Sequence, residues 1–231
     1  MNEREIAVIG GTGDQGFGLV LRWAAAGRRV VIGSRDAARA AEAAQQARQL
    51  LGPAAPEIQG VSNPEAAGAA SVVALAVPFS AQLATLKAIT PALAPGALLV
   101  DMTVALEATV GGSAARVLGV WAGSAAEQAA QHVPQGVEVA AAFHNTSAQS
   151  LRNLAAPVEC DVLVCADRAP TRLAVRPWVE AIPGCRYVDA GRLENARVVE
   201  AITALLIGIN RRYRVHTAGL RITGIEGSPA A

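Results

Sequence analysis

The chain has 231 residues, a net charge of +1, and 52% hydrophobic but only 3% aromatic residues. This length supports a substantial core, and the near-neutral charge gives no reason to expect nucleic acid or an anionic membrane surface as a partner. The N-terminal residues are charged, so we expect no secretory signal there. Pro78 interrupts the most apolar run, so we expect no membrane span. The three cysteines have no zinc-ligand spacing, so we expect a cytoplasmic protein with reduced thiols and no bound metal.

The first predicted elements are a strand over Glu5–Ile9 and a helix over Gln15–Ala26, joined by a glycine-rich turn. Gly11, Gly13 and Gly16 have the spacing G-x-G-x-x-G. In this context the first glycine permits a tight turn, the second lets the backbone approach a pyrophosphate, and the third lets the helix pack closely on the strand. The N–H groups at the helix start would bind the phosphates, so the pattern predicts a dinucleotide site.

The second strand, Arg29–Ile32, runs into Ser34 and Arg35, and Arg39 follows one helical turn later. A hydroxyl and two guanidinium groups suit the 2′-phosphate of NADP(H), whereas an NAD site usually has Asp or Glu at this position. We therefore predict NADP(H). The alternative is a solvated helix start at which Asp36 is only the N-cap.

Apolar strands and helices continue to alternate through the first 143 residues. We expect helices over Ala37–Leu51, Ala81–Ile89 and Ala125–His132, and strands over Ser71–Val77, Ala97–Asp101 and Val137–Phe143, with a break at Gly52-Pro53 and Pro56. Continuous apolar strands joined by helices indicate a parallel sheet buried on both faces. The prediction is an α/β fold, a Rossmann-type doubly wound parallel sheet, with an NADP(H)-binding domain over residues 1–143.

Residues 144–231 predict a smaller C-terminal α/β domain that ends in a long buried helix. Its expected elements are a helix over Ala148–Asn153, a strand over Asp161–Cys165, a helix over Thr171–Ala181, a strand over Arg186–Val188 and a helix over Leu193–Tyr213. Apolar residues occupy most faces of the last helix, so we expect it to pack against a second subunit; burial within one chain is the alternative. The tail Gly227–Ala231 is expected to be disordered.

Three segments should meet beyond the carboxyl ends of the strands, where this fold binds ligands: 77–80, 101–104 and 143–148. Pro78 would fix the direction of the first loop along the ribose or nicotinamide. His144 could donate to a carbonyl or relay a proton, and Asn145 and Thr146 could orient a ring. The alternative is that His144 only caps backbone groups.

Two further groups of residues have mainly structural interpretations. His132 and His216 lie near predicted helix ends and are expected to be structural or solvated. The cluster Arg211–Arg214 would complement the C-terminal dipole of the long helix, or else bind an anionic group of a second substrate.

From Ile6 to about Ile225 the sequence resembles the NADPH-dependent F420 reductases. The residues that carry the resemblance are Gly10-Gly11-Thr12-Gly13 with Gly16 and Gly18, Gly33-Ser34-Arg35, Ala142-Phe143-His144 with Ser147-Ala148, Asp189–Ala196, Ile209–Tyr213 and Gly219–Thr223. The resemblance implies a small homodimer that passes hydride between NADP(H) and the deazaflavin coenzyme F420. It also implies that the C-terminal domain closes the deazaflavin pocket.

The resemblance assigns roles to individual positions of this chain. Thr12, Gly13, Asp14 and Gln15 would line the pyrophosphate, Ser34, Arg35 and Arg39 would hold the 2′-phosphate, Val77 and Ala148 would flank the nicotinamide ribose, and His144 and Thr146 would lie near the deazaflavin. Such a reaction needs mainly alignment of two cofactors and exclusion of water, which agrees with the lack of a catalytic triad.

Departures from the family pattern concentrate around the second substrate. They are Asp101–Ala105 in place of an Asn-Pro or similar turn, Val77-Pro78-Phe79 in place of Val-Pro-Trp, and Asn145-Thr146. Two alternatives therefore stay open. One is an NADPH-dependent reductase of flavin, ferric iron or a small carbonyl or imine, and the other is a non-catalytic NADPH-binding module. The lack of Lys in the long helix counts against a hydroxyacid substrate.

Overall fold

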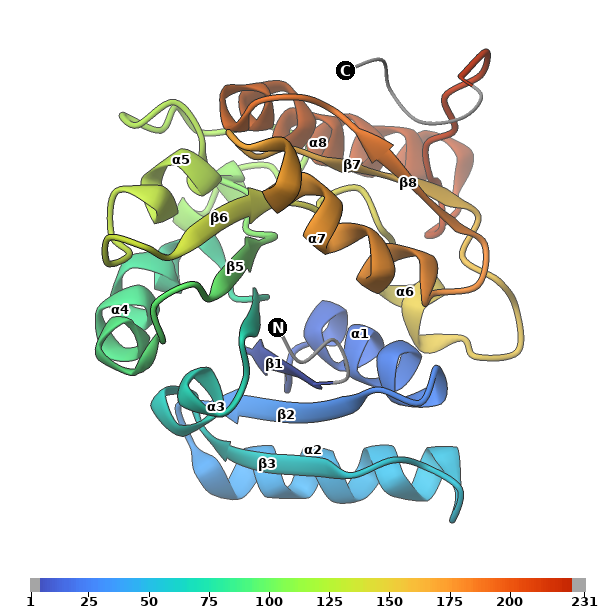
Figure 1. Cartoon of the computed structure of the whole chain (residues 1–231). Helices are drawn as coiled ribbons and strands as arrows, with labels where there is room; N and C mark the ends of the chain where they lie inside the picture. The colour runs from blue at the N-terminus through green and yellow to red at the C-terminus, as the bar shows by residue number, and fades with distance from the viewer. Residues whose placement is uncertain (1–4, 226–231) are drawn as a thin grey trace.

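The computed structural model describes residues 5–225, which contain a six-stranded parallel sheet in the order β3-β2-β1-β4-β5-β6 (Figure 1). The strands are β1 Glu5–Ile9, β2 Arg29–Ser34, β3 Ile58–Ser62, β4 Val72–Leu75, β5 Leu98–Asp101 and β6 Glu138–Ala141, followed by the separate parallel pair β7 Cys160–Val164 and β8 Cys185–Asp189. The helices are α1 Asp14–Ala25, α2 Ala37–Leu51, α3 Asn63–Ala69, α4 Phe79–Ile89, α5 Ala125–Ala130, α6 Ala148–Arg152, α7 Ala169–Glu180 and α8 Ala196–Tyr213.

Helices cover both faces of the sheet, because alternate residues of each strand point to opposite sides. In β1, Ile6 and Val8 join the core formed with α1 and α2, whereas Ala7 and Ile9 join the core formed with α3 and α4. The predicted Rossmann-type doubly wound sheet is therefore confirmed. The strand order reverses between β1 and β4, and such a reversal opens a crevice at the carboxyl ends of the strands.

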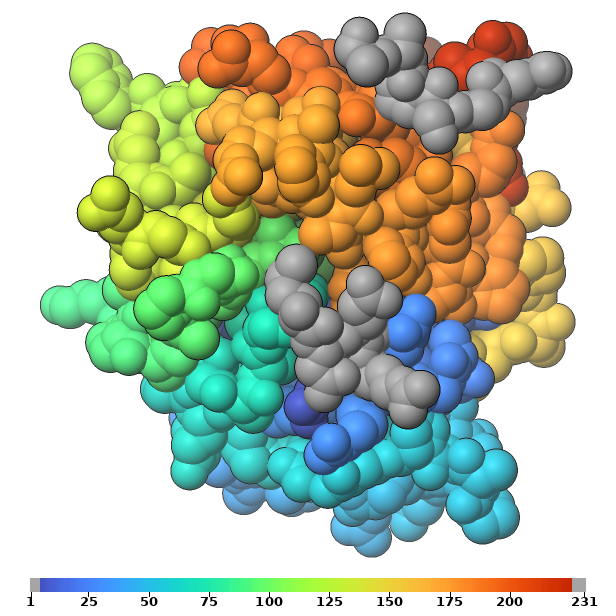
Figure 2. Space-filling model, viewed as in Figure 1, coloured from blue at the N-terminus to red at the C-terminus, as the bar shows by residue number. Residues whose placement is uncertain are grey.

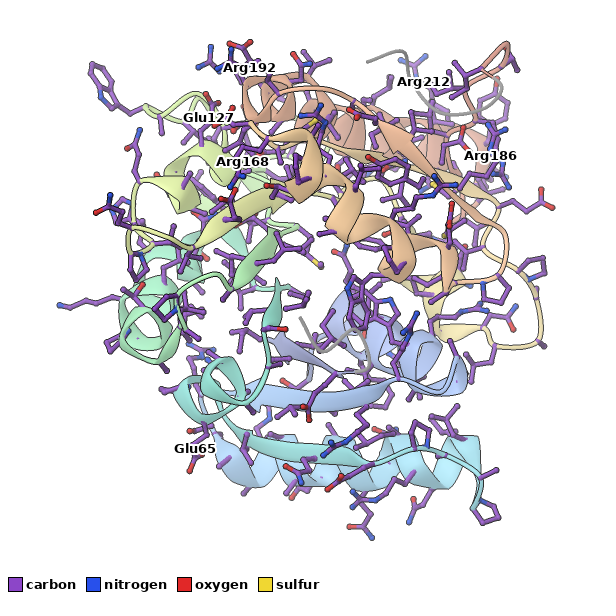
Figure 3. All side chains as sticks on the ribbon, in the orientation of Figure 1. Glu65, Glu127, Arg168, Arg186, Arg192 and Arg212 are labelled. Atoms are coloured by element: carbon purple, nitrogen blue, oxygen red, sulfur yellow. The ribbon has the colours of Figure 1, made fainter. Side chains whose placement is uncertain are left out.

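The strand β3 and the helix α3 were not predicted from the sequence, which indicated only a chain break near Pro56. A Cβ on Gly60 of β3 would overlap the backbone of Ala40 in α2. Glycine at this position therefore lets β3 and α2 pack closely, and the strand has no apolar side chain there. Ser62 and Glu65 form a capping box at the start of α3, where Figure 3 shows Glu65. This short strand and helix complete the edge of the sheet next to β2.

The C-terminal part packs directly on the Rossmann sheet. An antiparallel bridge joins Ala141, at the end of β6, to Cys165, just after β7. Trp23 of α1 makes edge-to-face contacts with both Phe143 and Trp178, so one core contains residues from both halves. On the face drawn in Figure 2, the orange residues of the C-terminal half lie directly against green and blue residues of the N-terminal half. The division between residues 143 and 144 stays a prediction, because this shared core gives it no sharp boundary.

Helix α6 is anchored to α1 by a buried arginine. Arg22 is 3% exposed, and its guanidinium donates to the carbonyls of four residues in and after α6. A Cβ on Gly18 would collide with Leu151, so glycine permits the close approach of the two helices. These contacts fix the position of Ala148 at the start of α6.

The long C-terminal helix was predicted correctly, and it is only partly buried within the single chain. Val199, Glu200, Ala204 and Leu206 face the protein, whereas Val198 and Leu205 are 67% and 63% exposed. Part of the helix is therefore buried within one chain, and its packing against a second subunit stays a prediction. Within residues 5–225, no helix has the length and apolar character needed to cross a bilayer.

Candidate active site

The glycine-rich turn leaves the start of α1 open for an anion. Gly10 has a φ of +79°, and its carbonyl accepts from the Gly13 N–H at 3.0 Å, which closes the turn directly after β1. Gly13 is the N-cap of α1 and supplies no side chain to the free N–H groups of the first turn. A Cβ on Gly16 would lie 2.5 Å from the Gly10 carbonyl oxygen. The turn can thus bind a pyrophosphate as its sequence predicts.

A cavity of about 530 Å³, here called the coenzyme cavity, adjoins this turn. It is lined by Gly10, Thr12, Gly13, Ser34, Arg35, Asp36, Arg39, Asn63, Ala76, Val77, Pro78, Ala81 and Thr85. Arg35 and Arg39 are exposed, and neither forms an ion pair with another residue in the described part of the chain. Two free guanidinium groups beside a hydroxyl fit a phosphate monoester.

Asp36 is the N-cap of α2, as the alternative interpretation expected. Its carboxylate accepts from the N–H groups of Ala38 and Arg39 and caps α2, while its own N–H donates to Ser34 Oγ. The cap holds the start of α2 beside the end of β2. As a result the side chains of Arg35 and Arg39 both border the coenzyme cavity.

Asn63 is a lining residue that the sequence did not reveal. It is 4% exposed, and its Oδ1 has no hydrogen-bond partner. Buried polar atoms without partners are rare in folded proteins, and at a cavity wall they are typical of a ligand site. Asn63 is the first residue of α3, so the failure to predict that helix also hid this residue.

Two further cavities meet at His144. The central cavity, of about 520 Å³, is lined by Gly13, Asp14, Gln15, Ala76, Val77, Pro78, Phe79, Ser80, Met102, Val104, Leu106, Ala108, Thr109, His144 and Thr203. The α6 cavity, of about 670 Å³, is lined by Asp14, Gln15, His144–Gln149, Arg152, Thr203, Leu206, Ile207, Asn210, His216 and Ala218. Val77 and Pro78 also line the coenzyme cavity, so the three spaces form a path from Arg35 to α8.

The chain turns into this site through a strained residue. Phe143 is fully buried and has a φ of +64°, an uncommon conformation for a residue with a side chain. Its carbonyl accepts from Gln15 Nε2 at 2.9 Å and from Thr146 Oγ1 at 2.7 Å. These bonds hold the turn at which His144 lies between the two cavities.

His144 is the clearest unpartnered group of the site. It is 3% exposed, and neither ring nitrogen has a hydrogen-bond partner, so it does not cap backbone groups. Burial lowers the pKa of His144 to about 3, because desolvation disfavours the imidazolium. The ring is therefore neutral near pH 7, where it can donate one hydrogen bond and accept another. Its burial disfavours the proton relay that we considered from the sequence.

Asn145 and Thr146 also line the α6 cavity, but both side chains are occupied by the fold. Asn145 Nδ2 donates to the Asp161 carbonyl at 2.8 Å and lies 3.2 Å from Cys160 Sγ, both in β7. Thr146 Oγ1 donates within its own turn. Among the polar atoms of the Asn145 and Thr146 side chains, only Asn145 Oδ1 lacks a partner. His144, whose two ring nitrogens are both unpartnered, is therefore the residue of the three best placed to contact a ring.

The other predicted residues lie around the same path. Asp14 pairs with Arg152 through a 2.6 Å contact, so its carboxylate is held beside α6. Ala148 is the first residue of α6 and borders the α6 cavity. His132 is exposed and bonded to the Gln128 carbonyl, as a structural role requires.

Helix α8 contributes residues that the sequence did not single out. Thr203 donates from Oγ1 to the His144 carbonyl at 2.8 Å and lines both the central and the α6 cavity. Asn210 of α8 borders the α6 cavity, and so does His216, which follows the helix and is exposed, one of the two roles expected for it from the sequence. The one signal in the sequence was a polar residue, Thr203, within the apolar stretch Ala201–Ile209 of the helix.

The Arg211–Arg214 cluster has a mainly structural setting. Arg211 and Arg212 occupy the last turn of α8, and Arg214 caps the helix with a φ of 55°. No group of His, Cys, Asp and Glu within residues 5–225 has the arrangement of a metal site.

Comparisons with known proteins agree with this geometry. The family model described as NADP oxidoreductase coenzyme F420-dependent matches residues 5–105. The F420-dependent NADP reductase of Methanothermobacter thermautotrophicus is 47% identical over 222 residues, which are 96% of this chain and 95% of that protein. The protein of the same name from Methanocaldococcus jannaschii is 40% identical over 224 residues, 96% of this chain and 99% of that protein.

The fold is also found in a solved structure. A crystal structure from Arthrobacter sp. FB24, described as a candidate F420-dependent NADP reductase, has a TM-score of 0.79 at 21% identity and covers 95% of this chain and 99% of that chain. At this identity the likeness shows the fold alone, whereas the 47% and 40% identical relatives show the family. The chain belongs to the family of F420-dependent NADP oxidoreductases.

Proposed function

We propose that this protein is an F420-dependent NADP reductase, which transfers a hydride between NADP(H) and the deazaflavin coenzyme F420. The observation that carries the proposal is the 40–47% identity to reductases of that name over 96% of the chain. The matched region includes the coenzyme cavity and the wall that α8 forms, so it spans both substrate sides of the site.

The groups around the coenzyme cavity are suited to NADP(H). Thr12 and Gly13 with the N–H groups of α1, including that of Gln15 in its first turn, would bind the pyrophosphate, and Ser34, Arg35 and Arg39 would bind the 2′-phosphate. Bound NADP(H) and F420 supply the donor and acceptor carbons between which the hydride moves. The protein has to hold these carbons in contact and exclude water.

The residues beyond Pro78 would hold the two rings. Val77, Pro78 and Ala148 would flank the nicotinamide and its ribose, and the central cavity would take the deazaflavin against it. The neutral imidazole of His144 would donate one hydrogen bond to a ring carbonyl without taking part in proton transfer. Thr203 would fix His144 through its 2.8 Å bond to the His144 carbonyl.

We also propose that the working form is a homodimer that packs through α8. The exposed side chains of Val198 and Leu205 lie on one helix and would be covered by a second copy. In this arrangement residues 144–231 would form the second-substrate and dimerisation part. Cys160, Cys165 and Cys185 are free and buried, which supports a reducing compartment such as the cytoplasm.

The test is anaerobic mixing of the purified protein with NADPH and F420, followed by the visible absorbance of the oxidised deazaflavin. We expect rapid bleaching with NADPH and much slower bleaching with NADH. If the protein binds NADPH but does not bleach F420, the coenzyme site stands and the acceptor assignment is wrong. A screen of flavin, ferric iron and imine acceptors would then identify the second substrate.

A further inference from the structure

A buried polar cluster lies at the end of β5, behind the wall of the central cavity. Asp101 is fully buried, and its carboxylate accepts from the Thr103 N–H at 2.8 Å, from Thr103 Oγ1 at 2.6 Å and from Gln82 Nε2 at 2.7 Å. Burial raises the pKa of Asp101 to about 6, while these donors favour its charged form. A buried carboxylate without hydrogen-bond donors costs free energy. Thr103 and Gln82 are therefore held in the positions from which they donate to Asp101.

Gln82 joins this cluster to two helices. It is a fully buried residue of α4, and its Nε2 lies 2.7 Å from Thr103 Oγ1 and 2.9 Å from the Ala125 carbonyl of α5. Its Oε1 accepts from Gln128 Nε2 at 2.8 Å. The Thr103 hydroxyl therefore donates to Asp101 and accepts from Gln82, which ties the segment after β5 to both α4 and α5.

The same segment presents its other side chains to the central cavity. Met102 and Val104 line that cavity, whereas Thr103, between them, is 2% exposed and points into the cluster. This alternation continues that of the strand, in which neighbouring side chains face opposite sides. The hydrogen bonds of Thr103 therefore set the position of Met102 and Val104 in the wall of the cavity, which Thr203 of α8 also lines.

None of the three cluster residues lines the coenzyme cavity. Its wall is built by the glycine-rich turn, the end of β2, Asn63, the residues around Val77, and Ala81 and Thr85 of α4, whereas Asp101, Gln82 and Thr103 are not part of it. Any displacement of Met102 and Val104 should consequently affect the second substrate more than NADP(H).

We propose that Asp101, Gln82 and Thr103 are positioning residues that hold the Met102–Val104 wall and thereby determine how the planar hydride acceptor is seated against the nicotinamide. This inference rests on the proposed function. None of the three touches either substrate; they act through the two apolar side chains that do. The wall is the part of the site that selects the acceptor, and the cluster gives it one fixed position.

The test compares Thr103→Val with Thr103→Ser in the full-length protein. Valine keeps the shape of threonine and removes the bridging hydroxyl, whereas serine keeps the hydroxyl. For Thr103→Val we expect KM for F420 to rise about tenfold, the effect of one buried hydrogen bond, with Kd for NADPH within about twofold of wild type. Thr103→Ser should keep the wild-type KM. Asp101→Asn, which keeps the side-chain size, should shift KM in the same direction as Thr103→Val.

Three outcomes contradict the inference. An unchanged KM for F420 in Thr103→Val would overturn it, and so would an equal loss of affinity for NADPH and F420, since the cluster would then only stabilise the fold. A loss of F420 affinity that serine does not restore would also contradict it. Wild-type protein that fails to turn over F420 would overturn the proposed function itself, and the wild-type assay in the same series separates this result from the others.

Discussion

His144 illustrates how burial decides the chemistry of a single residue. Its ring lies between two cavities with no partner for either nitrogen, and its pKa is lowered to about 3 by desolvation. A hydride transfer between two cofactors needs no protein acid at the reacting carbons. A neutral imidazole that donates one hydrogen bond is therefore sufficient, and a charged one would repel the positively charged ring of NADP⁺.

The low pKa of His144 predicts a specific acid sensitivity. Below pH 6.5 the unfolded chain gains a proton at this residue while the folded protein does not, so stability falls as the pH decreases. Between pH 7 and pH 5 the loss from this residue should be about 2 kcal/mol. Urea unfolding of His144→Gln should show a smaller loss over this range than wild type. His132→Gln is the control, because His132 is exposed, and it should behave as wild type. Equal losses in all three proteins would show that His144 is accessible to protons.

The position of Arg35 at the coenzyme cavity leads to a prediction about the preference for NADPH over NADH. Arg35→Ala should lower kcat/KM for NADPH roughly 10- to 100-fold, the effect of losing charge-assisted hydrogen bonds to a phosphate, and should leave the value for NADH nearly unchanged. Steady-state kinetics with both coenzymes measures this ratio. Lys87→Ala is the matched control, since Lys87 is an exposed cation of α4 that does not line the coenzyme cavity. A preserved preference for NADPH in Arg35→Ala would refute the assignment of this residue.

At the scale of elements, the turn between β1 and α1 depends on close backbone contacts. Gly10, Gly11 and Gly16 lie so near one another that a Cβ on Gly16 would come within 2.5 Å of the Gly10 oxygen and 2.9 Å of Gly11 Cα. Both of these are backbone atoms, which cannot move aside as the end of a flexible side chain can. The third glycine of the motif is therefore required for the turn itself.

Gly16→Ala should accordingly open the turn and weaken NADPH binding by at least about tenfold, because the α1 N–H groups would no longer be aligned with the pyrophosphate. Isothermal titration calorimetry with NADPH measures the loss. The control is Gly68→Ala in α3, where the nearest atom to an added Cβ is 3.6 Å away. That variant should bind NADPH normally and be slightly more stable, since alanine favours a helix. Normal binding by Gly16→Ala would contradict the proposed phosphate site.

At the scale of the whole molecule, α8 links the site to the proposed subunit contact. One side of the helix carries Thr203 toward His144, and another exposes Val198 and Leu205 to solvent. A homodimer through this surface would bury the apolar side chains and stiffen the helix that forms one wall of the site. The exposed Tyr213 lies at the end of the same helix.

If the protein forms the proposed homodimer through α8, a charge at Leu205 should separate the two subunits. Wild-type protein should have twice the chain mass of 23.6 kDa in light scattering coupled to gel filtration, and Leu205→Asp should have the mass of one chain. A buried unpaired carboxylate at the interface would be too costly to retain. Leu83→Asp introduces the same charge on α4, at a side chain that is 44% exposed, and should leave the mass unchanged. A wild-type mass of one chain would refute the homodimer.

The sequence by itself determined the Rossmann sheet, the phosphate turn and the Ser34–Arg35 end of β2, because each depends on neighbours within about one turn or strand. The capping box of Ser62 and Glu65 was also visible in the sequence and could have revealed α3. The polar edge strand β3 could not have been recognised by alternation, since Gly60 occupies its centre to fit α2.

Only the tertiary structure decided which residues meet. Thr203 and Asn63 reach the site from elements far along the chain from the glycine-rich turn, and local sequence signals for their helices do not show that these side chains line the site. The side chains of Asn145 and Thr146 were assigned to a ring by their place after a strand, yet the fold uses their hydrogen bonds. Burial, which sets the charge of His144 and Asp101, depends on the packing of the whole chain, and a local sequence does not contain that information.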